Sequence, residues 1–386
     1  MTTEQDLVAR ARVVAADDLA PRAAEIEAAG RIPPDLSRAL GEAGFYRLFL
    51  AQACGGFEAA PRTVAEVCEA LAQGDAACGW VTFIACTTTL AFGRLTDEAT
   101  REIMARPDSL ATGVFAANGR ATRVSGGFRV TGRWDWGSGS PNADWIGGGC
   151  VLLEDGQPLL NSAGLPRNHM LFFRADQVTS LDTWQVSGLR GTGSTAFEVR
   201  DVFVEDRHAA GVLRTRLPDR PLFRFPPFSP LAQGIGAVAL GIARAALDEA
   251  TRVAGEKRRG GASAPLAERP HTQIEIARAE ARLRAARAFF YGALDEAWAL
   301  TLAGEPVPLA LSRNMRLSVN HAVGESAAVV DAMYTLAGGT SVYATSPLQR
   351  QFRDIHVATQ HFMVSPNILE TTGRLFLGLP TNTAGF

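Results

Sequence analysis

The spacing of apolar residues changes twice along this chain of 386 residues. Up to about residue 110 they recur every three or four positions, which is the period of an α-helix. From there to about residue 211 they alternate in steps of two between Gly, Asn and Asp turns, and after the proline-rich segment 216–230 the helical period returns. The pattern predicts an α+β protein with an N-terminal α-helical domain (1–110), a central antiparallel β domain (111–213) and a C-terminal helical domain (214–386).

The C-terminal domain is predicted to be a four-helix bundle. Its helical period runs through 231–254, 272–303, 308–336 and 346–372, and these alanine-rich segments suit closely packed antiparallel helices. The second segment carries more apolar surface than one bundle seam uses, which indicates contact between subunits. In the N-terminal domain the same period predicts a helix pair at 61–73 and 76–95.

Charge and composition exclude several classes of protein. The 38 Lys and Arg residues nearly balance 40 Asp and Glu residues, so the net charge of -2 offers nucleic acid or a membrane surface no electrostatic attraction. No run of about 18 apolar residues is present and the N-terminus is charged, which predicts a cytoplasmic protein without a membrane span. The five cysteines form no CxxC and are interpreted as buried apolar residues, not as disulfide or metal ligands.

The stretch Val130–Trp145, "VTGRWDWGSGSPNADW", holds three of the six tryptophans. A turn that combines a flat aromatic side chain, a short hydroxyl and glycines open to close backbone approach suits a planar heteroaromatic ligand. The alternative is that the tryptophans are β-domain core, and we favour that interpretation for Trp134 and Trp145.

The G-x-W-x-W-x-S-G motif in this stretch, with A-D-W after it, a helical domain before it and a helix bundle behind it, resembles the acyl-CoA dehydrogenase fold over essentially the whole chain. The resemblance implies a flavin pocket in which the Trp136 ring lies near the isoalloxazine and the Ser138 hydroxyl bonds near N5 and O4. The segment "GLRGTGS" is similar to the form typical of the family's flavin monooxygenase branch. It implies that a second loop approaches the flavin through Gly191, Thr192, Gly193 and Ser194.

A third segment, Gly338–Ser341, resembles the loop that receives the flavin phosphate from a neighbouring subunit in this fold. Backbone N–H groups at Gly338 and Gly339 suit an anion. The resemblance implies a homotetramer, built as a dimer of dimers, in which the flavin site is completed by a second chain.

The dehydrogenase branch needs a glutamate that removes the substrate's α proton, and in the commonest subgroup it follows an R-D pair on the last long helix. When this chain is aligned on Arg353 and Asp354, Phe362 takes the position of that glutamate, and His361 is the residue before Phe362. R-D followed by His seven residues on resembles the two-component flavin monooxygenases. An imidazole can hold or release a proton at a flavin hydroperoxide or deprotonate a phenol. We therefore interpret His361 and Ser138 as catalytic.

Trp80, Thr88 and Phe362 are the predicted substrate contacts. Phenol hydroxylases of the group often carry a His eight residues after the Trp of a W-V pair, whereas this chain has Thr88. Because a neutral hydroxyl cannot stabilise a phenolate as an imidazolium can, a simple phenol is disfavoured. Hydroxylation of a polyketide aromatic, sulfur oxidation and an amine oxidation like that of the nitrososynthases stay open.

The resemblance thus implies the oxygenase component of a two-component monooxygenase, which uses reduced flavin (FMNH2 or FADH2) and O2 through a C4a-hydroperoxyflavin. No GxGxxG follows a predicted strand, so a separate NAD(P)H:flavin reductase is expected as partner. Two alternatives remain: an acyl-CoA dehydrogenase or oxidase with Glu256 as a displaced base, and a catalytically inactive scaffold of the same fold.

Overall fold

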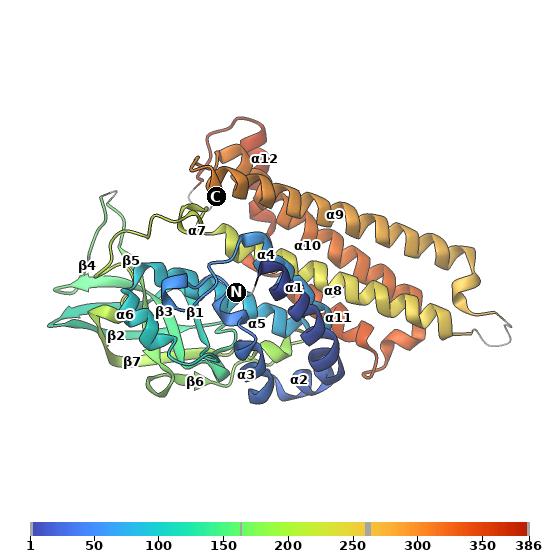
Figure 1. Cartoon of the computed structure of the whole chain (residues 1–386), viewed down its shortest axis with the longest axis horizontal. Helices are drawn as coiled ribbons and strands as arrows, with labels where there is room; N and C mark the ends of the chain where they lie inside the picture. Colours follow the sequence, from blue (N-terminus) through green and yellow to red (C-terminus); the bar gives the residue numbers. More distant parts are fainter. Residues whose placement is uncertain (1–2, 163, 259–263, 384–386) are drawn as a thin grey trace.

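The computed structural model describes residues 3–162, 164–258 and 264–383. Helices, a sheet and helices follow one another along the chain, and the sheet lies at one end of the molecule with the long bundle helices extending from it (Figure 1). The strands run from Ala111 to Glu205, inside the segment whose period of two predicted them. The boundaries assigned to three domains stay a prediction, because one continuous hydrophobic core joins all three segments.

Helices of the N-terminal segment begin where the sequence supplies caps. The Thr3 hydroxyl accepts the Asp6 N–H while the Asp6 carboxylate accepts the Thr3 N–H, a capping box. Asp75 caps the next-to-last helix, since its Oδ1 accepts the N–H groups of Ala77 and Cys78 at 3.0 and 3.1 Å. The helices are α1 Glu4–Val14, α2 Ala23–Ala29, α3 Pro34–Glu42, α4 Pro61–Gly74, α5 Ala76–Ala91 and α6 Asp97–Ile103, which confirms the predicted pair at 61–73 and 76–95.

The sheet is mixed, so the prediction of a purely antiparallel domain is wrong for one pair of strands. β1 and β3 run in parallel, while the other paired strands are antiparallel, in the order β4-β3-β1-β2-β7-β6 with β5 beside β3. The parallel pair arises because the chain leaves β2, crosses the end of β1 through residues 135–144, and returns on its other side. The strands are β1 Ala111–Val124, β2 Gly127–Trp134, β3 Trp145–Glu154, β4 Gln157–Pro158, β5 Asn168–Arg174, β6 Thr179–Leu181 and β7 Ala196–Glu205.

After the short helix α7 (Pro221–Arg224), the bundle consists of α8 Ser229–Glu256, α9 Pro270–Leu302, α10 Leu309–Ala337 and α11 Pro347–Ala358. α8 is central, because it packs against the other three and also against α4 and α5. Glycine makes the closest approach possible: a Cβ at Gly241 would overlap the carbonyl oxygen of Glu69 on α4.

The fourth predicted helix, 346–372, is broken in the structure. α11 ends at Ala358, and α12 (Pro366–Phe376) begins only after a turn and a short 3₁₀ segment at Phe362–Val364. Ser365 is extended, with φ -69° and ψ 161°, because a residue before proline avoids the helical region. His361 therefore lies in the break and not on a continuous helix.

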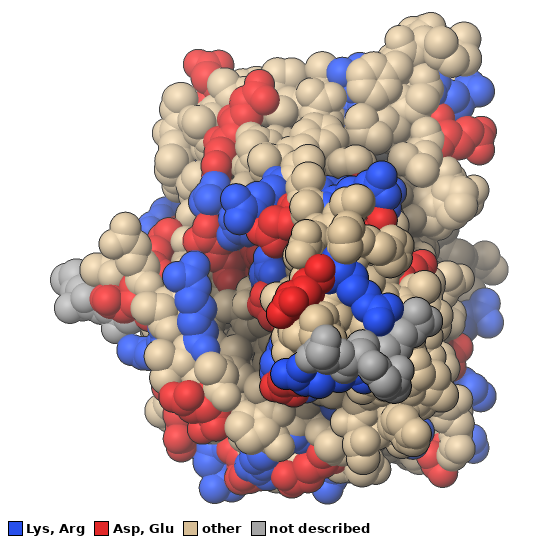
Figure 2. All heavy atoms as spheres, turned by 90° about the vertical axis from the view of Figure 1, so that its right-hand side faces the viewer, with Lys and Arg blue, Asp and Glu red and all other residues tan. Residues whose placement is uncertain are grey.

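Two helices, α5 with the turn after it (Ala76–Arg94) and α8, are long and apolar enough to cross a membrane, but 83% of each apolar window is buried inside the protein. They are its core helices. The five cysteines are likewise buried and unpaired, as predicted. At the end of the bundle away from the sheet, Lys and Arg side chains are interspersed with Asp and Glu (Figure 2).

Candidate active site

Four side chains from three segments of the chain form a continuous series of hydrogen bonds. The indole Nε1–H of Trp80, on α5, donates to Ser138 Oγ at 3.2 Å, and Ser138 Oγ lies 2.7 Å from Ser194 Oγ. Ser194 Oγ lies 2.6 Å from Thr192 Oγ1, which donates to the Leu189 carbonyl at 2.7 Å. All four side chains are buried. We call this series the hydroxyl chain.

The two ends of the hydroxyl chain determine the direction of every bond in it. A hydroxyl has one hydrogen, and Thr192 uses its own on the Leu189 carbonyl, so Ser194 must donate to Thr192. Ser138 must then donate to Ser194 and accept from Trp80, whose indole nitrogen can only donate. Ser138 consequently has no hydrogen left for a ligand and offers it only a lone pair.

Backbone hydrogen bonds between two loops hold Ser138 in its place in the hydroxyl chain. The loop after β2 is bound to the loop before β7 through Gly137 N–H on the Thr195 carbonyl (3.0 Å) and Gly139 N–H on the Thr192 carbonyl (2.8 Å). Gly139 has φ 77°, a conformation that favours glycine. The motif residues of the sequence thus form one rigid junction between two loops of the sheet.

Trp136, in the same loop, is turned outward. Its backbone has φ 61°, which is rare for a bulky residue, and 74% of its surface is exposed. The other two tryptophans of the stretch are core, as predicted: Trp134 is completely buried, its Nε1–H donating to the Gly149 carbonyl, and Trp145 is buried too. An exposed indole on a strained backbone beside a buried hydroxyl chain is an arrangement that a planar ligand would cover.

His361 reaches the same place from the bundle. Its ring lies edge-on to Trp80, with centroids 5.9 Å apart, and stacks on Phe362 at 4.8 Å. Residues distant in sequence, on α5, the β2–β3 loop, the segment before β7 and the break after α11, therefore meet around one indole ring.

The protonation of His361 follows from its surroundings. Burial, and then the nearby charge of Arg316, lower its pKa from 6.5 to about 4, so the ring is neutral at pH 7. Its Nδ1 accepts the Met363 N–H at 3.2 Å, which leaves the ring hydrogen on Nε2. Neutral His361 is thus a hydrogen-bond donor at Nε2 and a weak base.

Not every predicted substrate contact is free to act. The Thr88 hydroxyl is buried and donates to the Ile84 carbonyl one turn earlier, so it is occupied within its own helix. Phe362 is 66% exposed and covers one face of His361. Trp80 offers its ring but not its N–H, which Ser138 already accepts.

Gly338 and Gly339 lie away from the hydroxyl chain. Their loop contacts α10 and α11, at the end of the bundle away from the sheet (Figure 1). The Ser341 hydroxyl donates to the carbonyls of Tyr334 and Gly338 and is not available to an anion. Lys257, which donates to the Ala337 carbonyl at 2.7 Å, is the cation beside this loop.

Glu256, the base of the dehydrogenase alternative, lies at the C-terminus of α8. Its side chain is 67% exposed and pairs with Arg252 at 2.6 Å, and neither Trp80 nor Ser138 contacts it. A carboxylate in this position is a solvated helix-end charge, and the geometry gives it no part in the site around Trp80.

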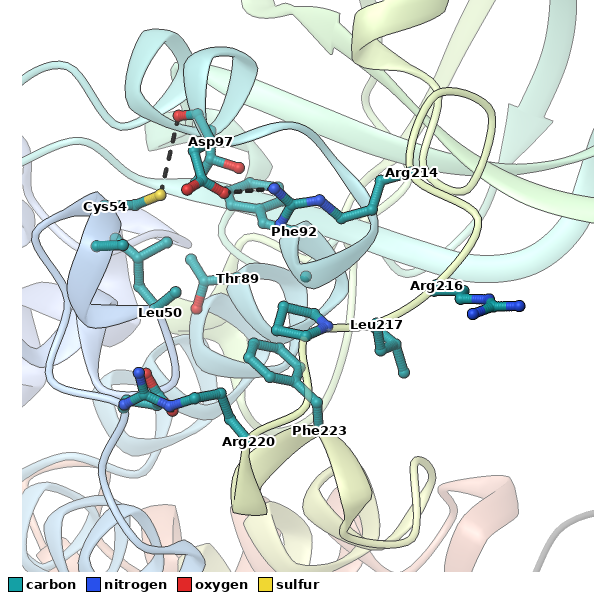
Figure 3. A pocket seen from close by; sticks show the side chains of 16 residues that line it. Leu50, Cys54, Thr89, Phe92, Asp97, Arg214, Arg216, Leu217, Arg220 and Phe223 are labelled. Carbon is teal, nitrogen blue, oxygen red and sulfur yellow. Dashed lines mark hydrogen bonds and ion pairs between the residues drawn. The ribbon is translucent and has the colours of Figure 1, made fainter.

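A pocket of about 320 Å³ opens near the C-terminal end of α5, against the linker 214–223 (Figure 3). Two ion pairs line it, Arg214 with Asp97 at 2.6 Å and Arg220 with Glu58 at 2.8 Å, while Arg216 points away from it. Within each pair the two charges offset each other. None of the predicted site residues lines it.

Sequence reasoning missed the part that Leu189 plays. It has φ 49°, and its carbonyl ends the hydroxyl chain. Asp354, used in the sequence only to align the chain, accepts the Leu189 N–H at 2.6 Å. The R-D pair itself was the signal that could have drawn attention to it.

The residues present fit a flavin. The Trp136 ring offers a flat exposed surface and Ser138, two residues on, offers a lone pair, while His361, which contacts Trp80, offers an N–H donor. Gly193, with φ 53°, keeps the neighbouring loop free of a side chain. These are the groups that a planar ring system with N–H and C=O edges requires.

The comparisons with known proteins agree with this geometry. The acyl-CoA dehydrogenase N-terminal domain family matches residues 1–106, and the C-terminal domain family matches residues 233–366. The chain is 36% identical to the indole-3-acetate monooxygenase of Pseudomonas putida over 92% of this chain and 90% of the relative. It is 30% identical to the flavin-dependent monooxygenase oxygenase subunit HsaA of Rhodococcus jostii over 94% of this chain and 96% of the relative.

Among solved structures, XiaF from a Streptomyces species, in complex with FADH2 and glycerol, superposes with a TM-score of 0.88 at 26% identity, covering 99% of this chain and 98% of that one. The relatives named are monooxygenases, which decides against the acyl-CoA dehydrogenase alternative with Glu256 as base and against an inactive scaffold. The chain belongs to the flavin-dependent monooxygenases with the acyl-CoA dehydrogenase fold, and it is an oxygenase that uses reduced flavin and O2.

Proposed function

We propose that this oxygenase hydroxylates a small aromatic molecule, that its flavin is FADH2, and that a separate NAD(P)H:flavin reductase supplies it. The observation that carries the proposal is the meeting of the hydroxyl chain and neutral His361 around Trp80. The FADH2 complex of XiaF supports the choice of flavin, and the description of HsaA as an oxygenase subunit supports a separate reductase.

The bound reduced flavin would supply the electrons that activate O2 for transfer of one oxygen atom to the substrate. Trp136 and the loops around Gly139 and Gly193 would hold its ring system, and Ser138 would accept a hydrogen bond from an N–H of that ring. The buried surroundings of Ser138 exclude water from this contact, which strengthens it.

His361 would act as a donor. With a pKa of about 4 it takes up a proton poorly, and its Nε2–H is the hydrogen-bond donor that the ring has to offer. We therefore assign it the role of polarising an oxygen atom through a hydrogen bond from Nε2–H, in preference to deprotonating a phenol. Phe362, stacked on the ring, would hold His361 in this orientation and form part of the substrate wall together with Trp80.

The substrate class rests on the site and on the relatives. Trp80 and Phe362 place aromatic rings on either side of His361, and buried Phe83 supports Trp80 from behind. With no imidazole at position 88, a substrate that does not need a stabilised phenolate is favoured, and the indole acid named for the Pseudomonas putida relative is of that kind. We propose an aromatic ring hydroxylated on carbon.

Assembly as a homotetramer and a cytoplasmic location belong to the same proposal. Hydrophobic residues of the bundle remain exposed on a single chain, and the Gly338 loop packs on α10 and α11 at the end of the bundle away from the sheet, whereas Ser138 lies in a loop of the sheet. A neighbouring chain would bring that loop, with Lys257 beside it, to the phosphate end of the flavin. The exposed hydrophobic side chains include Ile274, Phe289, Leu302, Leu309, Val342 and Tyr343.

The direct test omits the reductase. Purified protein, chemically reduced FAD and isotopically labelled O2 are mixed with a panel of indole acids, phenols, aryl amines and acyl-CoA thioesters. We expect labelled oxygen in an aromatic product. Label in an amine product only, or electron transfer from an acyl-CoA to oxidised FAD, would contradict the proposal.

A further inference from the structure

Side chains of α11 bind residues 187–189, the loop whose Leu189 carbonyl ends the hydroxyl chain. Arg353 donates through Nη1 to the Ser187 carbonyl, and Asp354 accepts the Leu189 N–H at 2.6 Å. Between them a Cβ at Gly188 would overlap the backbone of Arg353, so the loop lies directly on the helix. The R-D pair thus binds residues 187–189 at both ends, Arg353 at Ser187 and Asp354 at Leu189.

Leu189, which α11 holds through Asp354, has an unusual backbone conformation. Leu189 adopts φ 49° and ψ 30°, a left-handed conformation that costs free energy for a residue with a side chain. Such a conformation persists only where its surroundings hold it. The Leu189 N–H donates to buried Asp354, and the Leu189 carbonyl accepts the backbone N–H of Thr192 at 3.1 Å; the first of these is the contact made by a side chain. The φ and ψ angles of Leu189 relate the direction of its carbonyl to that of its N–H, so the bond to Asp354 also influences where the carbonyl points.

We propose that Asp354 is a positioning residue for the cofactor site. By holding Leu189 in this conformation it aims the Leu189 carbonyl at Thr192, which sets the direction of the hydroxyl chain and leaves Ser138 with only a lone pair for its ligand.

The proposal rests on the proposed function in one respect, the identity of the ligand as flavin. Reduced flavin carries a hydrogen on N5, whereas oxidised flavin carries a lone pair there. An acceptor-only Ser138 can bond the first and repels the second. Loss of the terminal acceptor would allow the hydroxyls to reverse, so that Ser138 could donate as well and the discrimination would fall.

What Leu189 needs from Asp354 is an oxygen acceptor and not a charge. Burial raises the pKa of Asp354 to about 7, against the lowering effect of the hydrogen bond from Leu189; Asp75 and Glu27 add to the rise and Arg350 opposes it. A protonated carboxyl keeps one acceptor oxygen, and an asparagine amide keeps the same oxygen in the same place. Asn at 354 should therefore preserve the effect, and an apolar side chain of similar size should not.

The experiment measures dissociation constants for FAD, oxidised and dithionite-reduced under anaerobic conditions, by titration of tryptophan fluorescence. The ratio of the two constants is compared among the wild type, Asp354→Asn, Asp354→Leu and Thr192→Val. Asp331→Asn is the matched control, since Asp331 is another carboxylate that contacts α11, through His356 at 2.9 Å, and both of these side chains are exposed.

We expect the wild type, Asp354→Asn and Asp331→Asn to share one ratio in favour of reduced FAD. Asp354→Leu and Thr192→Val should each reduce that ratio by about tenfold, the effect of one hydrogen bond of ordinary strength. Thr192→Val keeps Asp354 and Leu189 in place, so it tests the hydroxyl chain even if Asp354→Leu does not fold.

Failure of this inference differs from failure of the proposed function. An unchanged ratio in Thr192→Val, or a ratio in Asp354→Asn as low as in Asp354→Leu, would overturn the role of Asp354 while wild-type FAD binding stands. Wild-type protein that binds neither form of FAD would instead overturn the proposed function.

Discussion

Replacing Ser138 by alanine should weaken the fold and the flavin site together. The substitution removes the acceptor of the Trp80 indole N–H, at 3.2 Å, and the donor to Ser194, at 2.7 Å. Trp80 is only 7% exposed, so its N–H would be left without a partner inside the protein. The loss of these two hydrogen bonds, together with a buried Trp80 N–H that has no acceptor, should lower the free energy of unfolding by about 2–4 kcal/mol.

That loss predicts a modest shift in Tm. Unfolding entropy is about 2.1 cal/mol/K per residue, which for a chain of 386 residues means about 0.8 kcal/mol for each degree. The Tm of Ser138→Ala should fall by about 3–5 °C, as read by calorimetry. In turnover with reduced FAD and O2, more of the oxygen consumed should appear as H2O2 and less as product.

Ser140→Ala is the matched control. Ser140 lies two residues further along the same loop and is 8% exposed, and its hydroxyl makes no hydrogen bond within the part of the chain that the structure describes. It should shift neither the Tm nor the yield of H2O2 to a comparable extent. If Ser138→Ala melts within about 1 °C of the wild type and couples normally, the hydroxyl chain does not exist in solution and the reasoning fails.

Further expectations concern His361, Asp354 and the Gly338 loop. His361→Gln, whose amide can still donate, should keep more product formation than His361→Ala, which should lose about 100-fold; equal loss in both would argue against a donor role. Because the pKa of His361 is about 4 when folded and 6.5 when unfolded, its contribution to stability is complete above pH 6.5 and is lost as the pH falls through 4, by up to about 3 kcal/mol. A pH series of urea unfolding should show this slope in the wild type and not in His361→Gln. The pKa of Asp354 is raised instead, from 3.8 to about 7, so its contribution is present below pH 3.8 and lost as the pH rises through 7; Asp354→Asn should therefore gain stability over the wild type as the pH rises, and a constant difference would contradict the shift. Light scattering should show a tetramer. Gly338→Ala strains a backbone at φ 57° and ψ -143°, so it should weaken FAD binding without altering the hydroxyl chain. A stable monomer that binds FAD with full affinity would refute a flavin site shared between subunits.

Much of the secondary structure could be predicted because proline, glycine and capping residues mark its ends. Pro61 and Asp75 begin their helices as the sequence indicates. The parallel pairing of β1 with β3 could not be predicted, since a period of two shows which side chains share a face and not which strand lies alongside. The break after Ala358 was open to prediction, because Ser365 precedes a proline, but the apolar pattern continues across it.

The motifs brought the right loops together without showing how they work. Ser138, Thr192 and Ser194 were chosen from motif resemblance, and the structure links them in one series of hydrogen bonds through Ser194. The direction of their hydrogen bonds depends on Leu189 and Asp354, which are 165 residues apart. No local pattern encodes a left-handed leucine held by a distant carboxylate, so this part of the site had to be read from the structure.

The outward position of Trp136 gives the protein an optical reporter of its own occupancy. Trp134, Trp145 and Trp80 are buried and should emit at short wavelength, out of reach of an aqueous quencher such as iodide. The indole of Trp136 is largely in water, so a large share of the red-shifted, quenchable emission should come from it. A ligand that stacks against it would remove that emission by covering the ring and, for a flavin, by energy transfer. Filling of the site can therefore be followed on the unmodified protein, without any label near the loop.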